Sequence, residues 1–161
     1  MKLPDHVLPF WQAFANTQTH DPTPRFLEAF PFDDNEPSAN ELAELVLVGQ
    51  KRATAGLLWS FEHAGARVPE PGSLSIVTNF TGTPLWVIET QRVDLVPFKD
   101  VTAEFAATEG EGDGSLKFWR TAHDAYFGRE CQRIGRIPEP GMPVVCERFE
   151  VVYPQRATSD A

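Results

Sequence analysis

The chain has 161 residues, of which 42% are hydrophobic, and this length suits one compact domain with a substantial core. No apolar run approaches the roughly 18 residues of a membrane-spanning helix, and the first residues lack the apolar run of a secretory signal, so we expect a cytoplasmic protein without a membrane partner. The formal net charge of −9 disfavours general binding to nucleic-acid backbones, and we therefore expect no duplex DNA as a partner.

Residues 1–37 predict a helical elaboration on the domain. Phe10, Trp11 and Phe14 have helical spacing, which predicts a short helix over residues 7–14. The stretch 21–37 is rich in proline and aspartate and predicts an irregular connection. We expect a single domain over residues 1–161, with its core at residues 38–153 and a tail at residues 154–161.

Residues 38–60 predict a helix followed by a strand. Ser38 and Glu41 have the spacing of a capping box, in which both side chains bind exposed amides at a helix start. The pattern predicts a helix over residues 41–48, and Gly49 is suited to end it in a left-handed conformation. An apolar run follows at residues 55–60.

The rest of the chain alternates strand and helix patterns. Residues 74–78 and 85–93 predict a β-hairpin around the turn at residues 81–84. Residues 101–108 and 116–127 predict helices, the second capped by Ser115 or Asp113, and residues 143–153 predict a final strand. About five or six strands with flanking helices favour an α+β fold built on a small β-barrel.

Two cations and a hydroxyl follow the helix that Gly49 ends. Lys51 is suited to act as a base or an anion clamp, and Thr54 as a nucleophile that it activates. In the alternative interpretation, Lys51 and Arg52 are solvated, and their positive charges compensate the negative end of the helix dipole. On spacing alone, this alternative interpretation is the favoured one.

Three acidic residues alternate with glycines at Glu109, Glu111 and Asp113. In an extended backbone alternate side chains share a face, so two of these acids are expected to converge. Such a pair suits general acid–base chemistry or a divalent metal bound through oxygen. Alternatively the loop caps the following helix, which is the better interpretation for Asp113.

The helix predicted over residues 116–127 carries basic residues among aromatic ones, a pattern that can bind phosphates and stack bases. Arg120 is the nearest of them to the acidic loop and could instead form a structural ion pair with it. His123 lies on the apolar side of the helix, where a packed, hydrogen-bonded histidine is more common than a catalytic one.

The segment Gly-Gln-Lys-Arg-Ala-Thr at residues 49–54 resembles the Gly-x-Lys-x-x-Thr signature of the ASCH superfamily, which is similar in fold to the PUA RNA-binding domains. The longer bacterial ASCH-domain proteins also resemble this chain, at residues 87–90, 109–113, 115–116, 119–120 and 143–149. The resemblance covers roughly residues 41–153, and the ordered series of segments makes it more specific than one motif.

The resemblance implies an RNA-related function. The family is associated with RNA binding, with ribonuclease activity in some longer members, and with hydrolysis of N4-acetylcytidine in small ones. Those small enzymes use a lysine, a threonine and a glutamate, which fall by motif position on Lys51, Thr54 and Glu109. This chain departs from them in its longer N-terminus and in the glycine-spaced acidic loop.

We therefore expect an RNA-related hydrolase that binds single-stranded RNA or a modified nucleoside. In ribonuclease-type cleavage, Lys51 and Arg120 would stabilise the phosphorane and Glu109 would deprotonate the attacking oxygen. In an N4-acetylcytidine amidohydrolase, Thr54 would attack with Lys51 as base, and Glu109 would protonate the leaving amine. In a non-catalytic RNA- or nucleotide-binding module, Lys51 would hold a phosphate.

The expected site residues fall into two groups. The catalytic group is Lys51, Thr54 and Glu109, and the substrate-binding group is Arg52, Glu111 and Arg120. We assign no metal ligand and no certain cofactor, but a divalent metal at Glu109, Glu111 and Asp113 remains open, as does the oligomeric state.

Overall fold

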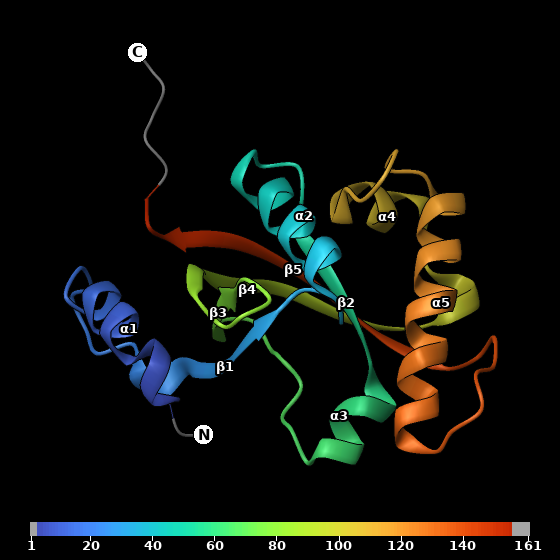
Figure 1. Cartoon of the computed structure of the whole chain (residues 1–161), viewed down its shortest axis with the longest axis horizontal. Helices are drawn as coiled ribbons and strands as arrows, with labels where there is room; N and C mark the ends of the chain where they lie inside the picture. Colours follow the sequence, from blue (N-terminus) through green and yellow to red (C-terminus); the bar gives the residue numbers. More distant parts are fainter. Residues whose placement is uncertain (1–2, 156–161) are drawn as a thin grey trace.

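The computed structural model describes residues 3–155, in which five strands form one curled half-barrel sheet with helices around it (Figure 1). The elements in chain order are α1 (Leu8–Ala15), β1 (Phe26–Pro31), α2 (Glu36–Leu47), β2 (Ala53–Leu57), α3 (Leu58–Ala64), β3 (Leu74–Thr78), β4 (Pro84–Pro97), α4 (Ala103–Glu109), α5 (Leu116–Ile134) and β5 (Pro143–Tyr153). The strand order is β1-β3-β4-β5-β2, and only the β1–β3 pairing among them is parallel. The α+β fold class predicted from the sequence is confirmed.

Strand β1 corrects one expectation, because it lies in the stretch 21–37 that the sequence indicated to be irregular. Its residues pair with β3 in parallel, from Phe26 opposite Leu74 to Pro31 opposite Thr78. β1 is a short edge strand whose pairing partner is distant in the sequence. Between prolines such a strand shows little of the alternating pattern that predicts a strand. The division of the chain at residue 37 stays a prediction, but β1 on its N-terminal side is part of the sheet.

Helix α2 begins at Glu36, several residues before the predicted start, because its cap is not the one that the sequence suggested. Asn35 is the N-cap, and its side-chain oxygen accepts the Ser38 backbone N–H at 3.0 Å. Pro37 falls in the first turn, where a helix leaves its N–H groups unpaired and proline is tolerated. The proposed capping box of Ser38 and Glu41 is therefore wrong.

The other predicted elements are confirmed. The hairpin appears as β3 and β4, the two later helices as α4 and α5, and the last strand as β5. Ser115 caps α5, its hydroxyl accepting the Phe118 N–H, and the helix continues past the predicted end to Ile134. The apolar run at residues 55–60 divides between the end of β2 and the start of α3.

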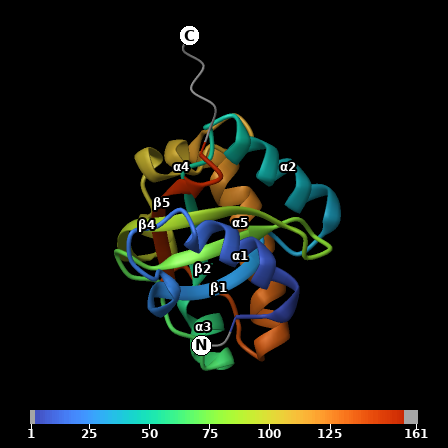
Figure 2. The same cartoon turned by 90° about the vertical axis from the view of Figure 1, so that its left-hand side faces the viewer.

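Helices pack on both faces of the sheet, which makes β3 buried along its whole length. Ile76 belongs to the core cluster under α1, whereas the next residue, Val77, belongs to the cluster under α2. Figure 2 shows α1 in front of the sheet, α2 and α4 above it and α3 below. A third cluster joins α4 and α5 to β2 and β5, and the site lies beside it.

Two strand pairings position the site. β4 and β5 pair along almost their full lengths, and β2 pairs with β5 from Ala53 opposite Arg148 to Leu57 opposite Val144. The segment before β2 is held against the end of α4, where the Arg52 backbone N–H bonds the Thr108 carbonyl. Within residues 3–155, no helix combines the length and the apolar composition needed to cross a membrane.

Candidate functional site

Lys51 is buried between the end of α2 and the start of β2, with 1% of its side chain exposed. Gly49, with a φ of 80°, turns the chain there, and the Lys51 backbone N–H bonds the Leu45 carbonyl. The ammonium donates to the Ala53 carbonyl at 2.8 Å, to Glu109 Oε2 at 2.9 Å and to Glu111 Oε2 at 3.0 Å. All three of its protons are therefore used within the protein.

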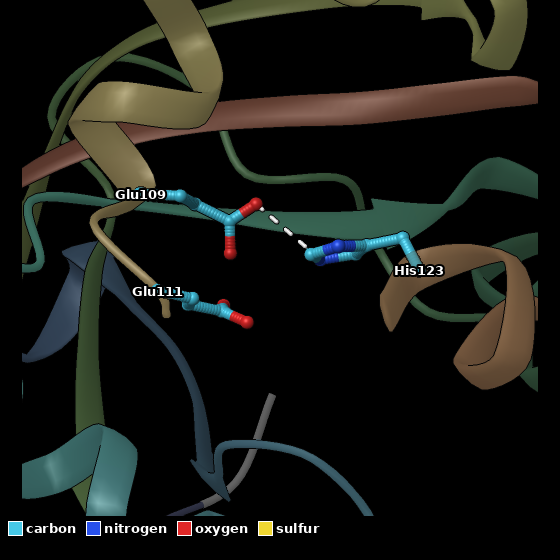
Figure 3. A group of neighbouring side chains, drawn as sticks. All are labelled: Glu109, Glu111 and His123. Carbon is cyan, nitrogen blue, oxygen red and sulfur yellow. Dashed lines mark ion pairs between the residues drawn. The ribbon is translucent and has the colours of Figure 1, made fainter. Parts of the chain in front are cut away.

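Glu109 is the last residue of α4, and 1% of its side chain is exposed. Its Oε2 accepts from Lys51, its Oε1 accepts the Trp119 indole N–H at 2.6 Å, and Oε1 also lies 3.4 Å from His123 Nε2. Figure 3 shows the side chains of Glu109, Glu111 and His123 pointing toward one another. Glu109 thus links two cations from separate elements.

Gly110 holds the acidic loop against the segment before Lys51. Its φ is 71°, and a Cβ at this position would lie 2.2 Å from the Gln50 carbonyl oxygen. The Gln50 side-chain N–H donates to the Gly110 carbonyl at 2.7 Å, and the Arg52 backbone N–H bonds the Thr108 carbonyl. The close approach requires glycine and places Glu111 beside the ammonium.

The charges of this cluster follow from burial and mutual attraction. Burial alone would lower the pKa of Lys51, but the carboxylates of Glu109 and Glu111 outweigh it and raise that pKa. Burial would raise the pKa of Glu109, yet Lys51 and His123 hold it well below its usual range. For Glu111 burial prevails and raises the pKa to about 7, despite Lys51. Lys51 is thus an ammonium, Glu109 a carboxylate, and Glu111 exchanges its proton near neutral pH.

His123 on α5 joins this cluster, although the sequence indicated only a packed histidine. Its Nδ1 lies 3.0 Å from the Trp119 carbonyl oxygen, and its Nε2 faces Glu109. Both ring nitrogens therefore face acceptors, which favours the doubly protonated ring. Burial lowers the pKa of His123, but Glu109 raises it above its usual value. The Trp119 ring stacks on the imidazole with ring centroids 4.1 Å apart.

The metal site left open by the sequence takes a different form in the structure. Asp113 is exposed, and its Oδ1 accepts the N–H of Ser115, the residue that caps α5, at 2.9 Å. Ligand atoms of Glu109, Glu111 and His123 lie within 4.8 Å of one another. The Lys51 ammonium, however, already bonds both carboxylates and supplies the positive charge between them. This donor set therefore fits a resident divalent metal poorly.

Thr54 on β2 lies where two hollows meet, and its hydroxyl makes no hydrogen bond within residues 3–155. The polar hollow, of about 50 Å³, is lined by Lys51, Glu109, Glu111 and His123 together with Thr54. The aromatic hollow, of about 290 Å³, is lined by Phe30, Phe32, Phe61, Tyr126, Glu28 and Glu147, again with Thr54. The structure thus brings Lys51, Thr54, Glu109 and Glu111 together at one cavity.

Arg52 and Arg120 are not part of this cavity. The Arg52 side chain is exposed and lines neither hollow. The Arg120 guanidinium donates to the carbonyls of Phe98, Lys99 and Val101 at 2.8 to 3.1 Å, and makes no ion pair with the acidic loop. It fastens the segment after β4 to α5, so the structure does not bring it to the other predicted site residues.

Solved structures share this fold over nearly the whole chain. An ASCH domain from Lactobacillus crispatus JV V101 has 33% sequence identity and a TM-score of 0.85, and the alignment covers 95% of this chain and 98% of that one. A protein from Enterococcus faecalis V583 has 29% identity and a TM-score of 0.79, with coverage of 91% and 88%. No curated protein matches the chain significantly.

The fold defines a PUA-like α+β domain of the RNA-binding type. A family model described as the ASCH domain matches residues 28–153, and the chain belongs to this family. The membership predicted from the signature at residues 49–54 is confirmed. The matched region begins within β1, in agreement with the pairing of that strand in the sheet.

Proposed function

We propose that the protein is a hydrolase that acts on RNA or on a modified nucleoside derived from it, at the polar hollow. The observation that carries this proposal is the buried ion pair of Lys51 and Glu109 beside the unpaired hydroxyl of Thr54. Burying two charges costs free energy that better packed apolar residues would avoid. Strongly shifted pKa values in a cavity are typical of catalytic sites. The position of Thr54 supports the same interpretation.

In this proposal Thr54 is the nucleophile and Glu111 its proton acceptor. The Glu111 carboxylate takes the hydroxyl proton as Thr54 Oγ1 bonds to the acyl carbon, and it returns that proton to the nitrogen as the C–N bond breaks. Water then attacks the ester carbon, and Glu111 takes its proton and returns it to Thr54 Oγ1 as the ester bond breaks and the carboxylic acid leaves. Lys51 stabilises the oxyanion by its positive charge alone, since all three of its protons are bound within the protein. Its two carboxylate partners keep it charged and unsuited to act as the base. Glu109 orients Lys51 and His123.

The charges around the two hollows favour an amide bond over a phosphodiester. The acidic residues that line them are Glu28, Asp33, Glu109, Glu111, Glu130 and Glu147, and the cations among the described lining residues are Lys51 and His123, both bound to Glu109. A phosphate would meet net repulsion there. Arg120, expected to stabilise a phosphorane, is bound elsewhere. An acylated neutral nucleoside such as N4-acetylcytidine suits these surroundings better than an RNA backbone does.

The test is to incubate the purified chain with N4-acetylcytidine and, separately, with single-stranded RNA oligomers. We expect release of acetate and cytidine, loss of turnover in Thr54→Val, and full activity in the control Thr19→Val, whose side chain is exposed. Cleavage of RNA alone would establish the phosphodiester reaction instead. Binding without turnover of either substrate would identify a non-catalytic module.

A further inference from the structure

The aromatic hollow has the form of a pocket for a flat ligand. Phe30 and Phe32 from β1 and its following segment, Phe61 from α3 and Tyr126 from α5 contribute its rings. Its volume of about 290 Å³ is near the lower end of the range for small-molecule sites. It shares Thr54 and Tyr126 with the polar hollow, so a ligand in it would place an attached group beside the Thr54 hydroxyl.

Polar groups without bonding partners face this apolar space. Glu147 on β5 is 6% exposed; its Oε2 accepts the Thr90 hydroxyl at 2.7 Å, while its Oε1 has no partner within residues 3–155. The Glu28 carboxyl lines the same hollow and makes no hydrogen bond or ion pair with any described residue. The Ser60 hydroxyl there is buried and also unpaired. Burial of such groups is unfavourable unless something bonds to them.

The bonding capacity of these groups defines the ligand. The two carboxyls offer mainly acceptor oxygens, so the missing partner must be rich in N–H donors. A planar ligand that carries N–H donors and lies between aromatic rings is typical of a nucleobase, which proteins bind by stacking and by hydrogen bonds to its edge. The exocyclic nitrogen of an amino base offers an N–H donor even when it is acylated, as in N4-acetylcytidine, whereas the carbonyl of an oxo base would face the carboxylate oxygens with its own lone pairs.

We propose that the aromatic hollow binds the nucleobase of the substrate, and that Glu147 with Glu28 selects bases carrying an exocyclic amino group over the corresponding oxo bases. The proposal rests on the proposed function only in taking a nucleoside unit as the ligand. Its ligand-binding groups are separate from Lys51, Glu109 and Glu111, which handle the bond that reacts.

The experiment is isothermal titration calorimetry of the full chain with two nucleoside pairs, cytidine against uridine and adenosine against inosine. Within each pair one base has an exocyclic amino group and a bare ring nitrogen, where the other has a carbonyl and a ring N–H. We expect the amino member to bind about tenfold more tightly in at least one pair, the difference of roughly one or two hydrogen bonds. Glu147→Gln should reduce that ratio to near one, and Glu28→Gln should reduce it partly.

The control variant is Glu150→Gln, an exposed glutamate on the same strand, which should keep the wild-type ratio. Equal affinity within both pairs, or a preference that survives both Glu147→Gln and Glu28→Gln, would overturn the proposal. These four nucleosides need no turnover. If no hydrolysis is found but Glu147→Gln abolishes the base preference, the base pocket is supported and the hydrolase function is refuted. If hydrolysis is found without any base preference, the base pocket is refuted and the hydrolase function is not.

Discussion

Thr54 and Glu147 lie directly opposite each other in the antiparallel pairing of β2 and β5. Side chains at directly opposed positions of such a pair project from the same face. The register of one strand pair therefore sets the distance between the proposed nucleophile and the proposed base-reading carboxyl. A ligand that spans both hollows is held against a rigid sheet rather than against a loop.

Lys51→Met should destabilise the protein strongly, because it leaves Glu109 and Glu111 buried beside each other without their shared cation. Removal of one member of a buried ion pair costs about 3–5 kcal/mol, and we expect a loss of that order in the free energy of unfolding. Urea denaturation followed by circular dichroism measures it.

The matched control is Arg92→Ala, which removes an ion pair with Asp94 whose arginine side chain is 64% exposed. Surface pairs contribute at most about 1 kcal/mol. Equal losses in the two variants would mean that the Lys51 cluster is not the buried, charged network that the structure shows.

The family resemblance placed Lys51, Thr54 and Glu109 in one expected site by motif position, and the structure brings these three side chains to one cavity. Their catalytic roles stay a prediction. The sequence could not predict His123 as a member of this site, since a histidine on an apolar helix face looks the same whether it packs or meets a carboxylate. The i, i+4 spacing of Trp119 and His123, next to the acidic loop, was the available signal.

Two acids of the acidic loop converge as expected, but the backbone between them is not extended. The alternation of acids with glycines suggested an extended backbone, but Gly110, Gly112 and Gly114 all have positive φ and turn the chain. Only Glu109 and Glu111 converge, and Asp113 is directed to the start of α5. Glu147 was not predicted as a site residue, because it fits the ordinary alternation of side chains along a strand. Only the tertiary packing shows that its side of β5 lines a hollow.

Activity should rise with pH through about 7. The carboxylate form of Glu111 is the proposed proton acceptor, and burial raises its pKa to about 7, so the active form is depleted below that pH and complete above it. Glu111→Gln should lower kcat/KM by about 10²- to 10⁴-fold and remove this dependence. The profile of N4-acetylcytidine hydrolysis measures both. The exposed Glu44→Gln control should keep the wild-type profile. A step near pH 7 that persists in Glu111→Gln would refute the assignment of Glu111 as the proton acceptor.

Glu147→Gln should stabilise the protein in alkaline solution. Burial raises the pKa of Glu147 from 4.5 to about 7, so the folded state binds this proton more tightly than the unfolded state does. The free energy of unfolding of the wild type therefore falls as pH rises from about 4.5 to 7, and the uncharged glutamine avoids that loss. We expect a gain on the order of 3 kcal/mol at pH 8 and little difference at pH 4.5. Thermal melts at the two pH values measure this gain, with Glu150→Gln as control. A gain that is the same at both pH values would show that the raised pKa of Glu147 is not its cause.

Gly110→Ala should damage both stability and activity, and Gly114→Ala provides the comparison. Both glycines have positive φ, 71° and 77°, so both substitutions carry the strain of about 1–2 kcal/mol that a left-handed alanine costs. Only at Gly110 would the new Cβ lie 2.2 Å from a backbone carbonyl oxygen, whereas nothing lies within 4 Å at Gly114. The chain around Gln50 must then move, and with it the contact between Glu111 and Lys51 on which the proposed proton transfer depends. We expect Gly110→Ala to lose at least about 2 kcal/mol more than Gly114→Ala in urea denaturation, and to lose turnover even at temperatures where it remains folded. Equal behaviour of the two variants would show that the position of the acidic loop does not depend on its close approach to Gln50.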